Sequence, residues 1–166
     1  MGTAITISGT VGAALEGAAL GIPALAISLQ TGVEYHLSYS QDVNFSVAGY
    51  FTTYFGRILL ERSMPEDVDV LKVDIPADAS IETPWEVTRL SRMRYYEPLA
   101  PERKSWEEPT RIGYAVALDA DKHGDDTDVY VLHIRRHISV TPLSLDLTSR
   151  VNFHELEALL QRKDQG

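Results

Sequence analysis

Two short apolar runs, each preceded by a helical segment, constrain the fold more than any other feature of the sequence. Val70–Ile75, which ends before Pro76, is apolar apart from Lys72 and Asp74, and Ala24–Leu29, between Pro23 and Gly32, is nearly continuous in apolar residues. Runs of this length and kind are typical of strands that are covered on both faces, as in a parallel sheet. Helical spacing of apolar residues over 11–20 and 43–62 precedes them. The order helix, strand, helix, strand therefore predicts an α/β sheet with right-handed crossovers.

The second half of the chain has a different pattern. Strands are predicted over 85–90 and 113–118, and the segment between them is rich in proline, basic and aromatic residues. This composition indicates an extended β-hairpin or arm, not a packed helix. We further expect a short helix over 128–136, a strand over 137–147 that is broken at Pro142, and an amphipathic C-terminal helix over 153–162. Residues 1–7 are expected to form a short strand or loop. No linker or repeat divides the sequence, so 1–166 is interpreted as one domain.

Charge and cysteine content exclude several classes of function. The 166 residues carry 24 acidic and 15 basic side chains, a net charge of −9, which disfavours a nucleic acid duplex as partner. The absence of cysteine excludes disulfides, zinc–cysteine sites and thiol catalysis. The sequence has no signal-peptide pattern and no apolar window long enough to span a membrane. We therefore expect a cytoplasmic protein without a membrane partner.

The strongest candidate site is the run Ser8, Gly9 and Thr10, directly before the first predicted helix. Two hydroxyl groups, a glycine and the free amides of a helix N-terminus suit a phosphate group. The alternative is a plain N-cap, in which Ser8 or Thr10 only completes the backbone hydrogen bonding of the helix. These three residues alone do not decide between the two interpretations.

Other clusters of chemically active residues give weaker signals. Asp119, Asp121 and His123 follow the spacing of a calcium loop, but Tyr130 occupies the twelfth position, where glutamate is needed. His133 and His137 are four residues apart, yet no carboxylate in register indicates a zinc site. A basic and aromatic cluster either grips a phosphate ester and stacks a base or only packs on a hairpin. Its members are Arg89, Arg92, Arg94, Tyr95 and Tyr96.

Six segments together resemble the SurE family of stationary-phase survival proteins. They occur in the family's order and extend over nearly the whole chain: 8–17 (SGTVGAALEG), 21–29 (GIPALAISL), 71–76 (LKVDIP), 87–90 (VTRL), 127–128 (TD) and 137–148 (HISVTPLSLDLT). The chain departs from the family pattern at Asp126, where the family has glycine, and at His137, where it has an aromatic residue. The resemblance implies the C-terminal part of a Rossmann-like SurE fold with an extended β-hairpin arm and a C-terminal helix.

The same resemblance implies a function. SurE proteins are divalent-metal-dependent phosphatases that act on nucleoside monophosphates, as 5′- or 3′-nucleotidases and acid phosphatases. Their metal ligands would lie before Met1, so the expected metal, Mg²⁺ or Mn²⁺, has no ligand in this chain. Only Ser8, Gly9 and Thr10 carry over, as the phosphate-binding wall of the site. The chain alone is then expected to be inactive, and the full protein to form a homodimer or homotetramer through swapped C-terminal elements. The alternative is a non-catalytic module for phosphate binding or oligomerisation.

Overall fold

A four-stranded mixed sheet forms the centre of the computed structural model, which describes residues 1–32, 35, 42–103, 105–110, 113–116 and 123–161. The strand order is β1-β2-β6-β3, with β1 parallel to β2, β2 antiparallel to β6, and β3 parallel to β6. The strands comprise Ala24–Leu29 (β1), Val70–Ile75 (β2), Trp85–Val87 (β3) and Ile138–Leu143 (β6). The parallel pairing of the two apolar runs confirms the prediction of an α/β sheet.

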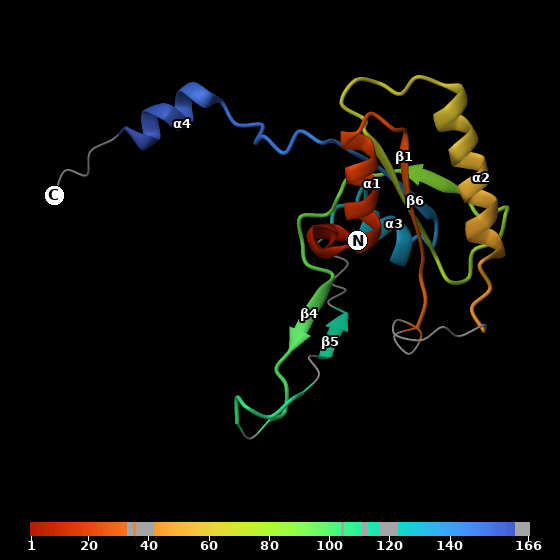
Figure 1. Ribbon diagram of the computed structural model, residues 1–166, viewed down its shortest axis with the longest axis horizontal. Coiled ribbons are helices and arrows are strands. Elements are labelled where there is room, and N and C mark those ends of the chain that lie inside the picture. The colour runs from red at the N-terminus through yellow and green to blue at the C-terminus, as the bar shows by residue number, and fades with distance from the viewer. Residues whose placement is uncertain (33–34, 36–41, 104, 111–112, 117–122, 162–166) are drawn as a thin grey trace.

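Helices α1 (Gly9–Ala19) and α2 (Ser46–Glu61) cover opposite faces of β1 (Figure 1). Ala24 and Ala26 pack with Val11 of α1, where small residues on both elements allow a close approach. The alternate residues Leu25, Ile27 and Leu29 pack against the cluster that contains Phe51 and Phe55 of α2. Successive side chains of a strand point to opposite faces of the sheet. One set of alternate apolar residues in β1 therefore packs against α1, and the other set packs against α2.

Two predictions about local structure are wrong. Residues Gly2–Ile7 form a 3₁₀ helix, η1, not a strand or loop. Strand β6 is not broken at Pro142, which pairs in register with Leu71 of β2. The carbonyl of Val140 accepts from Thr88 on the β3 side, so the nitrogen of Pro142 also faces that side. Pairing with β3 ends at Val140, and the missing N–H of proline therefore costs no ladder hydrogen bond.

Two segments project from the body of the protein (Figure 1). Strands β4 (Tyr96–Leu99) and β5 (Gly113–Val116) pair antiparallel and form the predicted arm. Helix α4 (Phe153–Leu160), capped by Asn152, has no buried residue. Its apolar side chains are therefore exposed to solvent. No helix among the residues that the structure describes is long and apolar enough to cross a membrane.

A buried charged cluster lies on the face of β2 opposite α2. Lys72 and Asp74 of β2 are 2% and 6% exposed, and they meet Asp128 at the start of α3 (Asp128–His133), which is fully buried. The Lys72 ammonium is paired with Asp74 and lies 3.0 Å from Oδ2 of Asp128. Burial opposes the charge on Lys72, but the two carboxylates outweigh it and hold the pKa of Lys72 above its usual value.

Asp128 is also the acceptor for three backbone N–H groups. Its Oδ2 accepts from Gly2 at 2.8 Å, and its Oδ1 accepts from Ser91 and Val129 at 2.9 Å each. Burial raises the pKa of this carboxyl group, while Lys72 and the backbone donors lower it more strongly, so the net shift is downward. One ionised side chain therefore joins η1, β2, α3 and the segment that leads to the arm.

We expect Asp128→Asn to lower the free energy of unfolding by about 3 kcal/mol, because it leaves a buried ammonium with one carboxylate in place of two. Asp126→Asn is the matched control: its carboxylate pairs with the exposed Arg89 at 2.9 Å, and such pairs contribute less than about 1 kcal/mol. Urea unfolding of both variants measures the difference. Equal and small losses would show that the buried cluster does not stabilise the fold.

Gly2→Ala is expected to lower the free energy of unfolding by about 1–3 kcal/mol, the usual cost of an unfavourable backbone conformation. Gly2 has a φ of +53°, and an added Cβ would lie 2.6 Å from the carbonyl oxygen of Met93. Gly56→Ala, inside α2 with open space around it, should instead raise stability by up to about 1 kcal/mol. Thermal unfolding that shifts both variants in the same direction would contradict this account.

Candidate functional site

The run Ser8, Gly9 and Thr10 lies at the N-terminus of α1, as the sequence predicts. Ser8 has an extended backbone, and its Oγ accepts a hydrogen bond from the N–H of Val11 at 3.3 Å. Gly9 and Thr10 are exposed, and nothing lies within 4 Å of a Cβ built on Gly9. The first N–H groups of a helix have no partner inside it. Ser8 is therefore an N-cap, and the exposed amides behind it remain open to an anion.

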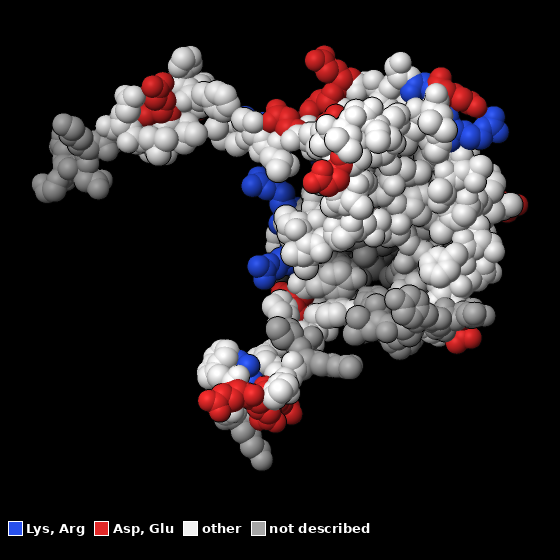
Figure 2. Space-filling view, in the orientation of Figure 1, with Lys and Arg blue, Asp and Glu red and all other residues white. Residues whose placement is uncertain are grey.

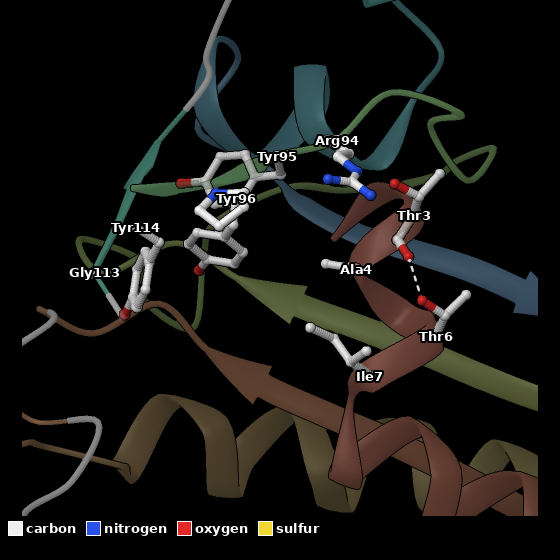
Figure 3. Close-up of a pocket in the computed structure, with 10 residues that line it drawn as sticks. Thr3, Ala4, Thr6, Ile7, Arg94, Tyr95, Tyr96, Gly113 and Tyr114 are labelled. Atoms are coloured by element: carbon white, nitrogen blue, oxygen red, sulfur yellow. Dashed lines mark hydrogen bonds between the residues drawn. The ribbon is translucent and has the colours of Figure 1, made fainter. Parts of the chain in front are cut away.

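A pocket of about 510 Å³ begins beside this helix N-terminus (Figure 3). One wall is η1, which contributes Thr3, Thr6 and Ile7. The opposite wall comes from the root of the arm, through Tyr96 of β4 and Tyr114 of β5. Ile7 directly precedes Ser8, so the pocket reaches the residue next to the helix cap. The volume lies within the range of about 300–1,000 Å³ that is common for small-molecule sites.

Four aromatic rings contact one another in a row, and three of them, those of Tyr95, Tyr96 and Tyr114, line the pocket. His133 stacks on Tyr95 with ring centroids 4.7 Å apart and an interplanar angle of 23°. Tyr95 meets Tyr96 edge to face at 4.5 Å, and Tyr96 meets Tyr114 edge to face at 5.0 Å. Tyr95 is 4% exposed, so the row extends from the protein interior to the arm. Edge-to-face pairs of this kind stabilise each other beyond the area they bury.

The hydroxyl groups of Tyr95 and Tyr96 stay protonated at physiological pH. Burial, with a smaller contribution from Tyr96, raises the pKa of Tyr95 to about 12. Burial, followed by Tyr114, also raises the pKa of Tyr96. Both phenols are therefore neutral groups that can donate or accept a hydrogen bond.

The structure brings together only part of the basic and aromatic cluster. Arg94, Tyr95 and Tyr96 line the pocket. Arg89 is directed elsewhere, because its guanidinium pairs with Asp126 at 2.9 Å. Arg92 is exposed and does not line the pocket. Figure 2 shows basic side chains at the inner corner where the arm leaves the body.

A second hollow of about 290 Å³ lies at the carboxyl ends of β1 and β2. Its lining includes Gln30 and Thr31 after β1, and Asp74 of β2. Tyr95 and Tyr96 line this hollow as well as the first pocket, so the tyrosine pair lies between the two. Crevices outside the carboxyl ends of parallel strands are the usual ligand sites of open α/β sheets. The edge of the sheet and the pocket are therefore adjacent parts of one region.

Those of the residues considered as metal ligands that the structure describes do not assemble into one site. Asp119 and Asp121 lie outside the described residues, while His123 is buried and bonds through Nδ1 to Oγ of Ser91 at 2.9 Å. His133 and His137 have separate partners: His137 contacts Glu86 at 2.6 Å, and His133 contacts the Tyr95 ring. Across the part of the chain that the structure describes, no group of three His, Asp or Glu side chains can hold a metal ion.

Sequence reasoning missed two contacts in this region. Tyr114 is 18 positions beyond Tyr96, and only the hairpin register brings the two rings together. Gly2 and Asp128 are 126 positions apart and are joined through a hydrogen bond. One signal was present: Lys72 and Asp74 share a face of an otherwise apolar strand, and buried charges on one face need a partner.

His133 makes the stability of this region dependent on pH. Burial, assisted by the nearby Arg136, lowers the pKa of His133 to about 4, and its Nε2 is buried with no hydrogen-bond partner among the described residues. Because an unfolded histidine titrates near 6.5, the unfolded state binds the proton first as the pH falls. Protonation therefore destabilises the fold progressively between about pH 6.5 and pH 4.

We expect His133→Phe, which keeps a ring against Tyr95, to weaken this dependence. The melting temperatures of the two proteins should run parallel above pH 7, where His133 is neutral in both states, and diverge below about pH 6.5 in favour of the variant. Thermal unfolding from pH 8 to pH 4.5 measures the difference. Parallel curves over the whole range would rule out His133 as the titrating group.

The chain is similar to proteins of one family. Residues 1–97 match the model of the family described as survival protein SurE. A protein of Thermococcus kodakarensis named 5′-nucleotidase SurE is 40% identical over 162 residues, which cover 96% of this chain and 61% of that protein. Its namesake in Methanocaldococcus jannaschii is 40% identical over 157 residues, 89% of this chain and 55% of the relative.

The fold agrees with these similarities. The crystal structure of the SurE protein from Aquifex aeolicus matches with a TM-score of 0.65 and 28% identity, over 96% of this chain and 59% of that one. The chain therefore spans about three fifths of the length of the T. kodakarensis protein and of the A. aeolicus protein. The sequence motifs, the Rossmann-like α/β sheet and these similarities agree: this chain belongs to the SurE family.

Proposed function

We propose that this chain takes part in the hydrolysis of nucleoside monophosphates and binds their phosphate group at the N-terminus of α1. The observation that carries the proposal is the pocket, whose lining residue Ile7 directly precedes Ser8, the cap of α1. The relatives from T. kodakarensis and M. jannaschii are named 5′-nucleotidases, which supports a nucleotide as the substrate. A helix N-terminus favours an anion both through its unpaired N–H groups and through its dipole.

In this proposal the chain binds and orients the substrate. The N–H groups of Gly9 and Thr10 donate hydrogen bonds to the phosphoryl oxygens, and Thr10, which carries a hydroxyl group, is exposed beside them. The cap bond from Val11 to Ser8 keeps the first turn of the helix in shape, so the amides need no rearrangement on binding. Water replaces the ester oxygen at phosphorus, and the products are a nucleoside and inorganic phosphate.

A divalent metal, Mg²⁺ or Mn²⁺, is part of the proposal. Such an ion supplies an activated water and neutralises charge on the phosphoryl oxygens. The described residues do not fit it, because they contain no group of three metal-binding side chains. We therefore derive no step through the metal, and we expect these 166 residues alone to show little or no turnover. Cytoplasmic location also stays a proposal.

The exposed apolar surface favours a second role, assembly of a homodimer or homotetramer. Phe153, Leu159 and Leu160 of α4 are 61%, 60% and 76% exposed, and Leu99 of the arm is 51% exposed. Apolar surfaces of this kind commonly mark protein interfaces. A non-catalytic module for phosphate binding or oligomerisation would need only these surfaces and the helix N-terminus.

A pair of substitutions at Ser8 that differ in charge tests the phosphate site. Ser8→Asn and Ser8→Asp both keep a good N-cap, so neither should lower stability by more than about 1 kcal/mol. They have nearly the same size but differ in charge, and the carboxylate would repel a phosphate. We expect Ser8→Asp to weaken AMP binding at least roughly tenfold relative to Ser8→Asn, a difference of about 1.4 kcal/mol.

Phosphorus NMR of AMP titrated with each purified variant measures binding without requiring turnover. Circular dichroism and thermal unfolding check that both variants are folded. Equal affinities for AMP in the two variants would place the phosphate elsewhere. Hydrolysis assays with added Mn²⁺ or Mg²⁺, run in parallel, report on the activity itself.

A further inference from the structure

We propose that the pocket between η1 and the root of the arm binds the base of the nucleotide, with Tyr96 and Tyr114 as its aromatic wall. The inference rests on the proposed function and adds to it the part of the substrate that the arm recognises. It starts from the position of the pocket, which lies between Ile7, the residue before the helix cap, and the hairpin (Figure 3).

The walls suit a flat, uncharged aromatic ring. Tyr95, Tyr96 and Tyr114 present ring surface from one side, and Ala4 and Ile7 present aliphatic surface from the other. Nucleobases stack readily on tyrosine, because every base has a π-face. The phenols are neutral, since burial holds the pKa of Tyr95 and Tyr96 above the usual value. An apolar wall with neutral polar groups is typical of small-molecule sites.

The charge of the pocket differs from that of the protein as a whole. The chain carries a net charge of −9, yet none of the described residues that line this pocket is acidic. Arg94 is the lining residue that carries a charge, and its positive sign suits a nucleotide. The absence of acidic side chains from the described lining, in a protein that is acidic as a whole, favours a ligand that carries negative charge.

The edges of the pocket offer hydrogen-bonding groups for the heteroatoms of a base. The Thr6 hydroxyl donates to the carbonyl of Thr3 at 3.0 Å, and that of Thr3 donates to the carbonyl of Met93 at 3.4 Å. Both hydroxyl oxygens keep lone pairs that can accept from an amino group. The neutral phenols of the tyrosine row can act as donors.

The pocket connects the base to the proposed phosphate position. Ile7 lines the pocket and Ser8, the next residue, caps α1. A nucleotide whose base lies against the tyrosines therefore has its ribose near Ile7 and its phosphate at the amides of Gly9 and Thr10. The root of the arm completes this arrangement, because the register pairs Pro98 with Tyr114 and both line the pocket.

The test uses adenosine and ribose 5-phosphate, which separate the base from the phosphate. Binding of each to the 166-residue protein is measured by NMR, with the tyrosine rings observed through isotope labelling. The variants are Tyr114→Leu, which keeps apolar bulk without a π-face, and Tyr114→Phe, which keeps the ring. Tyr50→Ala on α2 is the control, since Tyr50 is 45% exposed and does not line the pocket.

We expect adenosine to shift the ring signals of Tyr96 and Tyr114 and to bind Tyr114→Leu about tenfold more weakly than the unaltered protein. Tyr114→Phe and Tyr50→Ala should bind it normally, and ribose 5-phosphate should bind all four proteins alike. Adenosine that leaves these rings unperturbed, or that binds Tyr114→Leu as well as Tyr114→Phe, would overturn the inference.

The two proposals can fail separately. Adenosine binding that depends on Tyr114, without any effect of Ser8→Asp on AMP, would support the base site and contradict the phosphate site. AMP binding that depends on position 8 but not on Tyr114 would do the reverse. The arm would then have no part in recognising the base.

Discussion

The buried carboxylate of Asp128 is the interaction on which the rest of the structure depends. Its pairing with Lys72 fixes α3 to the centre of the sheet, and its bonds to Gly2 and Ser91 fix two further segments. The opposite face of the sheet is held by apolar packing with α2. The two faces therefore differ: the face under α2 excludes water through apolar contacts, whereas the face under α1 combines an apolar cluster with buried charges that have specific partners.

The same carboxylate positions both walls of the pocket. Gly2, whose N–H donates to Asp128, is the first residue of η1, and η1 ends next to Ser8, the cap of α1. Ser91, whose N–H also donates to Asp128, is the first residue of the segment that reaches Tyr95 and Tyr96 within five residues. Because Asp128 holds the start of each wall, the distance between the walls depends on the core and not on solvent-exposed loops. A site held in this way can be formed before its ligand arrives.

Local signals explain what could be predicted from the sequence. The bounds of β1 and β2 follow from short, mainly apolar runs next to proline or glycine, and Ser8 is the cap of α1 because capping involves only its own neighbours. Features set by distant contacts were missed. The helix η1 needs the left-handed backbone of Gly2 and an acceptor 126 positions away, and the tyrosine row needs the register of the hairpin. Neither contact leaves a periodic pattern in the sequence.

The proposed substrate contacts belong to elements of different rigidity. The phosphate position is a helix N-terminus anchored by Val11, which is 3% exposed in the core. The base position is half built from the arm, whose strands β4 and β5 form a separate two-stranded sheet among the described residues. Changes in the arm can therefore alter which base is accepted while the helix amides keep their place. In the proposed arrangement, recognition of the phosphate common to all nucleotides falls to the helix that is anchored in the core, and selection among bases falls to the projecting hairpin.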